Sequence, residues 1–178
     1  MNTRYIALLR GINVGGNNII KMTDLKSCFE QMGFSNVKTY IQSGNVLFNS
    51  DEKSASTLVT EIEKAISERF HYTSSIVLIS QEQLQEIIAN APADFGEDSS
   101  LYRYDVLFLK PPLTAEEAIK DIRTIDGIDN LYSGKGVLYF SRLIEKAHQS
   151  YLNKLVMQPI YKQMTIRNWN TSTKLMSL

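Results

Sequence analysis

Two stretches of the chain resemble each other, and this repeat constrains the fold more than any other feature of the sequence. The first is Tyr40-Ile-Gln-Ser-Gly-Asn-Val-Leu-Phe48 and the second is Tyr132-Ser-Gly-Lys-Gly-Val-Leu-Tyr-Phe140. Both contain Ser-Gly and then Val-Leu with an aromatic residue, which predicts two strands joined by a tight turn. Because short hairpins resemble one another by chance, the repeat rests mainly on the elements around them.

The same order of elements surrounds each hairpin. In the first half, the residue patterns predict a strand over 5–9, a helix from an N-cap at Thr23 to a stop at Gly33, a helix over 55–66 and a strand over 75–79. In the second half they predict a strand over 105–109, a helix capped by Thr114, one helix over 147–156, a strand over 165–169 and a short last helix capped by Asn170 or Thr171. The β-α-β-β-α-β order therefore occurs twice. It predicts an α+β fold of duplicated ferredoxin-like units, each an antiparallel sheet with helices packed on it.

The domain boundaries follow from a change in composition between the halves. A capping box of Ser80 and Gln83 starts an additional helix, after which residues 91–100 contain Pro92, Gly96 and three acidic residues. We therefore expect a first unit over residues 1–90, a linker over 91–102 and a second unit over 103–178. Whether the two units are intertwined is left open by the sequence.

The composition excludes several classes of protein. The chain of 178 residues is 43% hydrophobic and 21% charged, as in globular proteins, and its 19 basic and 19 acidic residues balance. A zero net charge argues against duplex DNA or an anionic membrane as partner. One cysteine supports neither a disulfide framework nor a metal cluster. We therefore expect no metal site. Because no apolar run is long enough for a signal peptide or a membrane span, we also expect a cytoplasmic protein.

The clearest differences between the halves mark a candidate site. The first half has a Gly/Asn-rich loop from Gly11 to about Met22, where the second has only residues 110–113. The last strand of the second half carries Ile166-Arg-Asn-Trp-Asn170, where the first half has Ile76-Val-Leu-Ile79. Alternation along a strand would place Ile166 and Asn168 on one face and Arg167 and Trp169 on the other. Loop insertions and polar residues of this kind are often functional.

These segments could form an anion site. Glycines with positive φ expose backbone N–H groups next to a helix N-terminus, and basic side chains would add charge. The residues we expect to bind a small anionic or phosphate-bearing ligand are Arg10, Gly11, Asn13, Gly15, Gly16, Asn17, Lys21, Ser43, Asn45, Arg167, Asn168 and Thr171. A structural role is the alternative for each of them: the loop asparagines would hydrogen-bond their own backbone, and Ser43 and Asn45 would form a turn. The polar residues Arg167, Asn168, Asn170 and Thr171 would cap the last helix and tie it to the sheet.

A binding module without catalysis is the second hypothesis. Lys135-Gly136 and the aromatic residues after it partly match an RNA-recognition strand, and an open sheet face with Tyr139 or its neighbours pointing outward would also suit a protein partner. His71 and His148 lie far apart, and Cys28 falls on the apolar stripe of its helix. The sequence therefore assigns no catalytic residue, cofactor or oligomeric state.

Several of these strings together resemble a known family. They are Ala7-Leu-Leu-Arg-Gly-Ile-Asn-Val-Gly-Gly16, Thr39-Tyr-Ile-Gln-Ser-Gly-Asn-Val46, Asp105-Val-Leu-Phe108 and Ile166-Arg-Asn-Trp-Asn-Thr171, with Met22 and Leu25. In this order they resemble the bacterial domain-of-unknown-function family 1697, over essentially the whole chain. The resemblance implies two related ferredoxin-like halves and no established activity or cofactor.

Overall fold

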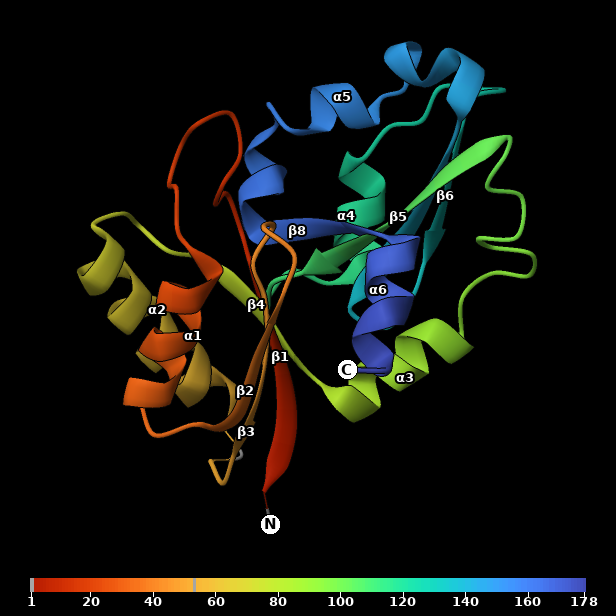
Figure 1. Cartoon of the computed structure of the whole chain (residues 1–178). Helices are drawn as coiled ribbons and strands as arrows, with labels where there is room; N and C mark the ends of the chain where they lie inside the picture. The colour runs from red at the N-terminus through yellow and green to blue at the C-terminus, as the bar shows by residue number, and fades with distance from the viewer. Residues whose placement is uncertain (1, 53) are drawn as a thin grey trace. The chain divides into compact units, whose positions relative to one another are not determined.

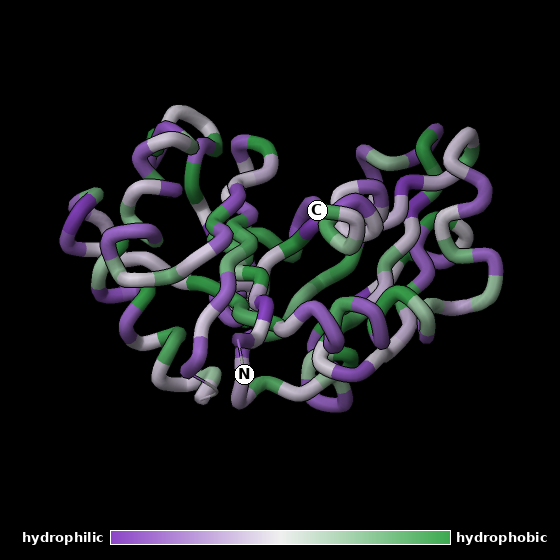
Figure 2. The backbone as a smooth tube through the Cα atoms, turned by 60° about the horizontal axis from the view of Figure 1, so that its bottom comes forward, coloured by the Kyte–Doolittle hydropathy of each residue, from purple (hydrophilic) through white to green (hydrophobic). Residues whose placement is uncertain are grey.

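The computed structural model describes residues 2–52 and 54–178, and it divides the chain into two compact units (Figure 1). The first unit contains the residues up to Leu84 together with Leu178, and the second contains Gln85–Ser177. Each unit has its own four-stranded antiparallel sheet. Within each unit the hydrophobic stretches of the trace lie mostly inside, and the outer turns are mostly hydrophilic (Figure 2).

The first unit has the predicted element order. It consists of β1 (Thr3–Leu9), α1 (Met22–Gln31), β2 (Ser35–Tyr40), β3 (Asn45–Ser50), α2 (Ala55–Phe70) and β4 (Ile76–Ser80). The strands lie in the order β2-β3-β1-β4, and α1 and α2 lie on the same side of the sheet (Figure 1). Alternate residues of β1, including Ala7 and Leu9, pack with Phe29 of α1 and Leu58 of α2 in one buried cluster. Cys28 is buried in the same cluster, as predicted.

The second unit repeats this arrangement. It contains β5 (Tyr102–Leu109), α4 (Ala115–Asp121), β6 (Asp129–Ser133), β7 (Val137–Leu143), α5 (Leu152–Leu155), β8 (Met164–Asn168) and α6 (Trp169–Met176). Its strand order, β6-β7-β5-β8, corresponds position by position to that of the first sheet. The predicted α+β fold with ferredoxin-like strand order is therefore confirmed. No strand is exchanged between the two sheets among the residues that the structure describes.

Four predicted helix starts can be compared with the structure. Ser80 and Gln83 form the predicted capping box before α3 (Gln81–Ala89), because each side chain bonds the other residue's backbone N–H. Thr114 also caps α4 as predicted. The N-cap predicted at Thr23 is wrong, because α1 begins at Met22 and follows Lys21, whose side chain makes no capping bond. The cap predicted at Asn170 or Thr171 is also wrong, because α6 begins at Trp169 and Asn168 is its N-cap.

The helix predicted over residues 147–156 is broken into short pieces. A 3₁₀ helix (Ile144–Gln149) ends at Ser150, which leaves the helical conformation with φ of −55° and ψ of 141°, and α5 spans only four residues. A second 3₁₀ helix (Pro159–Gln163) then leads into β8. The break at Ser150 is held by buried Asp129, whose Oδ2 accepts hydrogen bonds from Tyr151 N (2.9 Å) and Ile125 N (3.0 Å). A distant side chain therefore overrides the helical periodicity of this segment.

The segment that was expected to be a linker is instead part of the second unit. Phe95 is only 8% exposed, and its ring lies 4.9, 5.4 and 5.1 Å from the ring centroids of Tyr104, Tyr139 and Trp169. The last part of α3 also contacts the second unit, because Tyr139 Oη donates a hydrogen bond of 2.5 Å to the carbonyl of Ile87. The structure therefore places the boundary inside α3, between residues 84 and 85.

Among residues 2–52 and 54–178, no helix has the length and apolar character needed to cross a membrane. Over the same residues, no group of three or more His, Cys, Asp or Glu side chains is placed to hold a metal ion.

Candidate functional site

The Gly/Asn-rich loop of the first unit is held together by its own asparagines. Asn13 Nδ2 donates to the carbonyls of Ile20 (3.0 Å) and Gln42 (2.8 Å), and its Oδ1 accepts a bond from Ile20 N (2.8 Å). Asn18 Nδ2 donates to the carbonyl of Gly11 at 2.9 Å. Both asparagines have positive φ, a conformation that Asn tolerates better than most residues. The amide donor that the anion hypothesis required at Asn13 therefore closes the loop, together with that of Asn18.

The glycines at the tip of this loop form a small hairpin. Val14 and Asn17 make an isolated β-bridge, and Gly15 and Gly16 between them have φ of +58° and +76°. Positive φ at both central residues is what a type I′ hairpin turn requires. All four residues are exposed. The glycines are therefore explained by the turn itself.

The Ser43–Asn45 turn lies against the loop, as the sequence hypothesis required. Besides the bond from Asn13 to Gln42, Ile12 of the loop packs so closely on Gly44 that a Cβ there would lie 2.6 Å from Ile12 Cδ1. Asn45 is fully buried and its Nδ2 donates to Tyr40 O (2.8 Å) and Ser43 Oγ (3.1 Å). The turn is thus stabilised by packing and internal hydrogen bonds.

The basic residues of the loop lie at its two ends. Arg10 is half-buried, and its backbone N–H donates to the carbonyl of Ser75 at 2.9 Å. Lys21 is exposed and directly precedes α1.

The polar last strand divides between the two faces of the second sheet. Arg167 is only 6% exposed, and its Nη1 donates to Thr165 Oγ1 (2.8 Å) and to the carbonyl of Ile166 (2.9 Å). Burial lowers the pKa of Arg167 to about 10. Asn168 lies on the opposite face and caps α6, since its Oδ1 accepts a bond of 2.7 Å from Thr171 N. The end of β8 thus contributes Asn168, and not Arg167, to the cavity described next.

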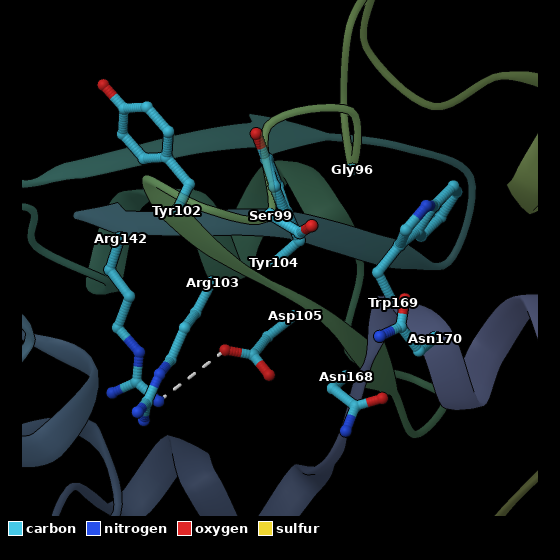
Figure 3. Close-up of a pocket in the computed structure, with 10 residues that line it drawn as sticks. All are labelled: Gly96, Ser99, Tyr102, Arg103, Tyr104, Asp105, Arg142, Asn168, Trp169 and Asn170. Carbon is cyan, nitrogen blue, oxygen red and sulfur yellow. Dashed lines mark ion pairs between the residues drawn. The ribbon is translucent and has the colours of Figure 1, made fainter. Parts of the chain in front are cut away.

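A cavity of about 400 Å³ opens at this end of the second sheet (Figure 3). It lies where β8 stops: β8 pairs with Asp105–Leu109 of β5, whereas Tyr102–Tyr104 pair with β7 alone among the described strands. The start of β5, the end of β7, the 96–99 segment and the start of α6 surround the opening. Its lining residues are Gly96, Ser99, Tyr102, Arg103, Tyr104, Asp105, Arg142, Asn168, Trp169 and Asn170.

Two arginines face each other in this cavity. Arg103 of β5 and Arg142 of β7 are direct cross-strand partners in the sheet register. Figure 3 shows both side chains extending to the same side of the sheet, toward Asp105. Like charges opposite each other on one face destabilise a sheet when nothing lies between them. The pair therefore creates a local excess of positive charge in a chain whose total charge is zero.

Asp105 only partly balances these arginines. Its Oδ2 lies 3.9 Å from Arg142 Nη2, which is the outer limit of an ion pair, and this oxygen is buried without a hydrogen bond among the described residues. Asp105 is 9% exposed. Burial raises the pKa of its carboxyl group, and the charges of Arg142 and Arg103 act in the opposite direction. A buried carboxylate oxygen without a donor is costly and would gain from a ligand that donates to it.

The start of α6 adds further polarity to the cavity. Asn168 as N-cap and the first two helical residues, Trp169 and Asn170, all line the opening. The N-terminus of a helix carries a partial positive charge and directs backbone N–H groups outward, which favours an anion. The helix start therefore favours an anion in the cavity, as Arg103 and Arg142 do.

Aromatic rings form the other side of the cavity. In Figure 3, Trp169 and Tyr102 extend away from the arginines, on the opposite side of β5. Trp169 rests on Gly96, where φ is +92° and an added Cβ would lie 2.2 Å from Trp169 Nε1. Trp169 also makes an edge-on contact with Phe95 at 5.1 Å. The cavity thus has a charged side, formed by the arginines and Asp105, and an aromatic side, formed by Tyr102 and Trp169.

The comparisons place the chain in a family but assign it no activity. A model of the family described as protein of unknown function (DUF1697) matches residues 1–139. The chain belongs to this family. It is also similar to a solved structure described as conserved bacterial protein SP0830 from Streptococcus pneumoniae, with 31% identity, a TM-score of 0.87 and coverage of 99% of this chain and 98% of that one. No protein with a curated description matches.

Most residues that line the cavity of this DUF1697 protein are not among those that the sequence patterns predict to bind a ligand. The predicted strand began at Asp105, whereas β5 begins at Tyr102, so the alternating Tyr102-Arg-Tyr-Asp105 pattern was not recognised as part of a strand. That alternation was the available signal, because it places two tyrosines on one face and Arg103 with Asp105 on the other. Nothing local marks Arg142, whose position depends on strand pairing.

Proposed function

We propose that this DUF1697 protein binds a small anionic ligand, such as a phosphate-bearing metabolite, in the cavity between β5, β7 and α6. The observation that carries the proposal is the cross-strand pair of Arg103 and Arg142 beside the start of α6. An anion between the two guanidinium groups would relieve their repulsion and accept hydrogen bonds from both. Arginine is the residue best suited to hold phosphate or carboxylate in this way.

The cavity supports this proposal better than the Gly/Asn-rich loop does. In the loop, the side-chain amides of Asn13 and Asn18 bond to carbonyls of the first unit, and the Gly15-Gly16 backbone forms a turn. In the cavity, two arginines and a helix start converge on one volume. The aromatic side would pack against a ring or hydrocarbon part of the ligand.

The alternative, a binding module that uses an open sheet face, has less support. It expects Tyr139 or its neighbours to point outward; Tyr132 is 45% exposed, but Tyr139 is 1% exposed and its hydroxyl group bonds to Ile87. Burial also raises the pKa of Tyr139. The central strand of the second sheet therefore offers no stacking platform at this position.

The proposal can be tested with the intrinsic fluorescence of the protein. Trp169 is the only tryptophan of the chain and lines the cavity, so its emission should change when a ligand binds. We expect inorganic phosphate, phosphate monoesters or nucleotides to produce a saturable change. Arg103→Ala and Arg142→Ala should each weaken binding about tenfold or more, since a charge-assisted hydrogen bond contributes about 1.5–3 kcal/mol.

Two further variants serve as controls for this titration. Arg123→Ala removes an exposed arginine of the same unit that does not line the cavity, and it should leave binding unchanged. Arg10→Ala removes the arginine of the loop hypothesis. Loss of binding in Arg10→Ala with full binding in Arg142→Ala would move the site to the loop and overturn the proposal.

A further inference from the structure

We infer that the ligand of this cavity pairs its anionic group with a hydrogen-bond donor, an ammonium or hydroxyl group, and that Asp105 is the residue that recognises this donor. The inference rests on the proposed function, because it concerns the same cavity. It adds the chemical class of the ligand and the residue that selects it.

The first argument is the position of the carboxylate group. Asp105 lies on the same face as Arg103, two residues along β5, and Figure 3 shows its side chain directed toward the arginines and into the cavity. Asp105 directly opposes Asn168 in the sheet register. A ligand whose anion contacts both arginines would therefore have its neighbouring atoms close to Asp105.

The second argument is that Oδ2 of Asp105 lacks a donor. The side chain is 12% exposed, and this oxygen makes no hydrogen bond to a described residue, although Arg142 Nη2 lies 3.9 Å away. If Asp105 served only to neutralise the arginines, a short two-point contact with a guanidinium group would be expected. The longer separation leaves this buried oxygen unsatisfied, and a rotation of the carboxylate group toward the cavity would let it accept a hydrogen bond from a ligand.

The third argument concerns discrimination. An isolated carboxylate in an anion site repels a plain anion, so it lowers affinity for phosphate or acetate itself. A carboxylate favours binding there only if the ligand donates a hydrogen bond to it. A site built around a buried acceptor rejects analogues that leave this acceptor without a hydrogen bond. Zwitterionic or hydroxylated anions satisfy both the arginines and Asp105.

Three phosphate monoesters of similar size test the inference: n-propyl phosphate, 3-hydroxypropyl phosphate and 3-aminopropyl phosphate. We expect the hydroxyl compound, the amino compound or both to bind the wild-type protein at least tenfold more tightly than propyl phosphate, measured by Trp169 fluorescence and by calorimetry. In Asp105→Ala this preference should disappear, while propyl phosphate binds as well as before or better. Asp105→Asn, which keeps the shape of the side chain, should lose the preference for the amino compound.

The outcomes separate the two claims. If all three compounds bind the wild-type protein equally, the inference fails and anion binding stands. If Asp105→Ala and Asp105→Asn change the affinity for all three compounds by the same factor, Asp105 only positions Arg142, and the inference fails as well. If none of the compounds, nor inorganic phosphate, binds, the proposed function itself fails. Thermal unfolding of each variant without ligand shows whether it is folded.

Discussion

The contact between Gly96 and Trp169 gives a prediction whose size can be worked out from the structure. In Gly96→Ala, the new Cβ would lie 2.2 Å from Nε1 and 2.3 Å from Cδ1 of Trp169, so the indole ring must move. The φ of +92° adds backbone strain of about 1–2 kcal/mol for a residue with a side chain. Overpacking adds about 1–3 kcal/mol, part of it from the edge contact between Trp169 and Phe95. We therefore expect a loss of about 2–5 kcal/mol in the free energy of unfolding.

The matched control for this variant is Gly136→Ala in the same unit. Gly136 has a φ of +73° but no atom within 4 Å of an added Cβ, so only the strain of about 1–2 kcal/mol should remain. Urea denaturation followed by Trp169 fluorescence measures both losses, because the only tryptophan reports on the second unit. The folded-state emission of Gly96→Ala should also shift. Equal losses in the two variants and unchanged emission would refute the packing of Trp169 on Gly96.

Three other predictions follow from single side chains. Tyr139→Phe removes the hydrogen bond to Ile87 and should lower the free energy of unfolding by about 1 kcal/mol in urea denaturation; no change would contradict the docking of α3 in the second unit. Asn13→Ala removes three loop hydrogen bonds and should destabilise the first unit by about 2–3 kcal/mol without altering ligand titrations, whereas lost binding would support the loop hypothesis. Asp105 has a raised pKa, so the folded state holds its proton more firmly than the unfolded state, and the wild type should lose stability as the pH rises from about 3.8 through the raised value. Asp105→Asn should remove this loss and be more stable at neutral pH, and equal pH profiles of stability in the two proteins would contradict this expectation.

The repeat was predictable because both halves have the same local signals. The hairpins around Gly44 and Gly134–Gly136 are encoded within a few residues. The capping boxes at Ser80 and Thr114 are equally local, although they start helices that do not correspond to each other in the repeat. Strand pairing then follows from the ferredoxin-like element order. The fold class could therefore be derived from the sequence alone.

The failures have a common physical cause, which is contact between residues distant in sequence. The break at Ser150 depends on Asp129, and the segment around Phe95 is ordered by Tyr139 and Trp169. The helical periodicity of residues 147–156 does not indicate the contact with Asp129. The acidic and glycine-containing composition of residues 91–100 likewise predicts a linker and gives no sign of the contacts that Phe95 makes.

The candidate site was missed for a related reason. The Gly/Asn-rich loop is conspicuous in the sequence because a compact hairpin needs glycine and asparagine at positions of positive φ. Arg103 and Arg142 lie 39 positions apart and become neighbours only when β5 pairs with β7. Of the twelve residues expected to bind a ligand, the structure places only Asn168 in the cavity.

The most direct test of the account is a crystal structure of the protein with selenate, an anion whose selenium atom is located by its anomalous scattering. The account predicts a selenium peak between the guanidinium groups of Arg103 and Arg142, with oxygens within about 3 Å of both, as charge-assisted hydrogen bonds require. The peak should be lost in Arg142→Ala. A peak at the Gly11–Asn18 loop, or the absence of any peak in the cavity at saturating selenate, would contradict it.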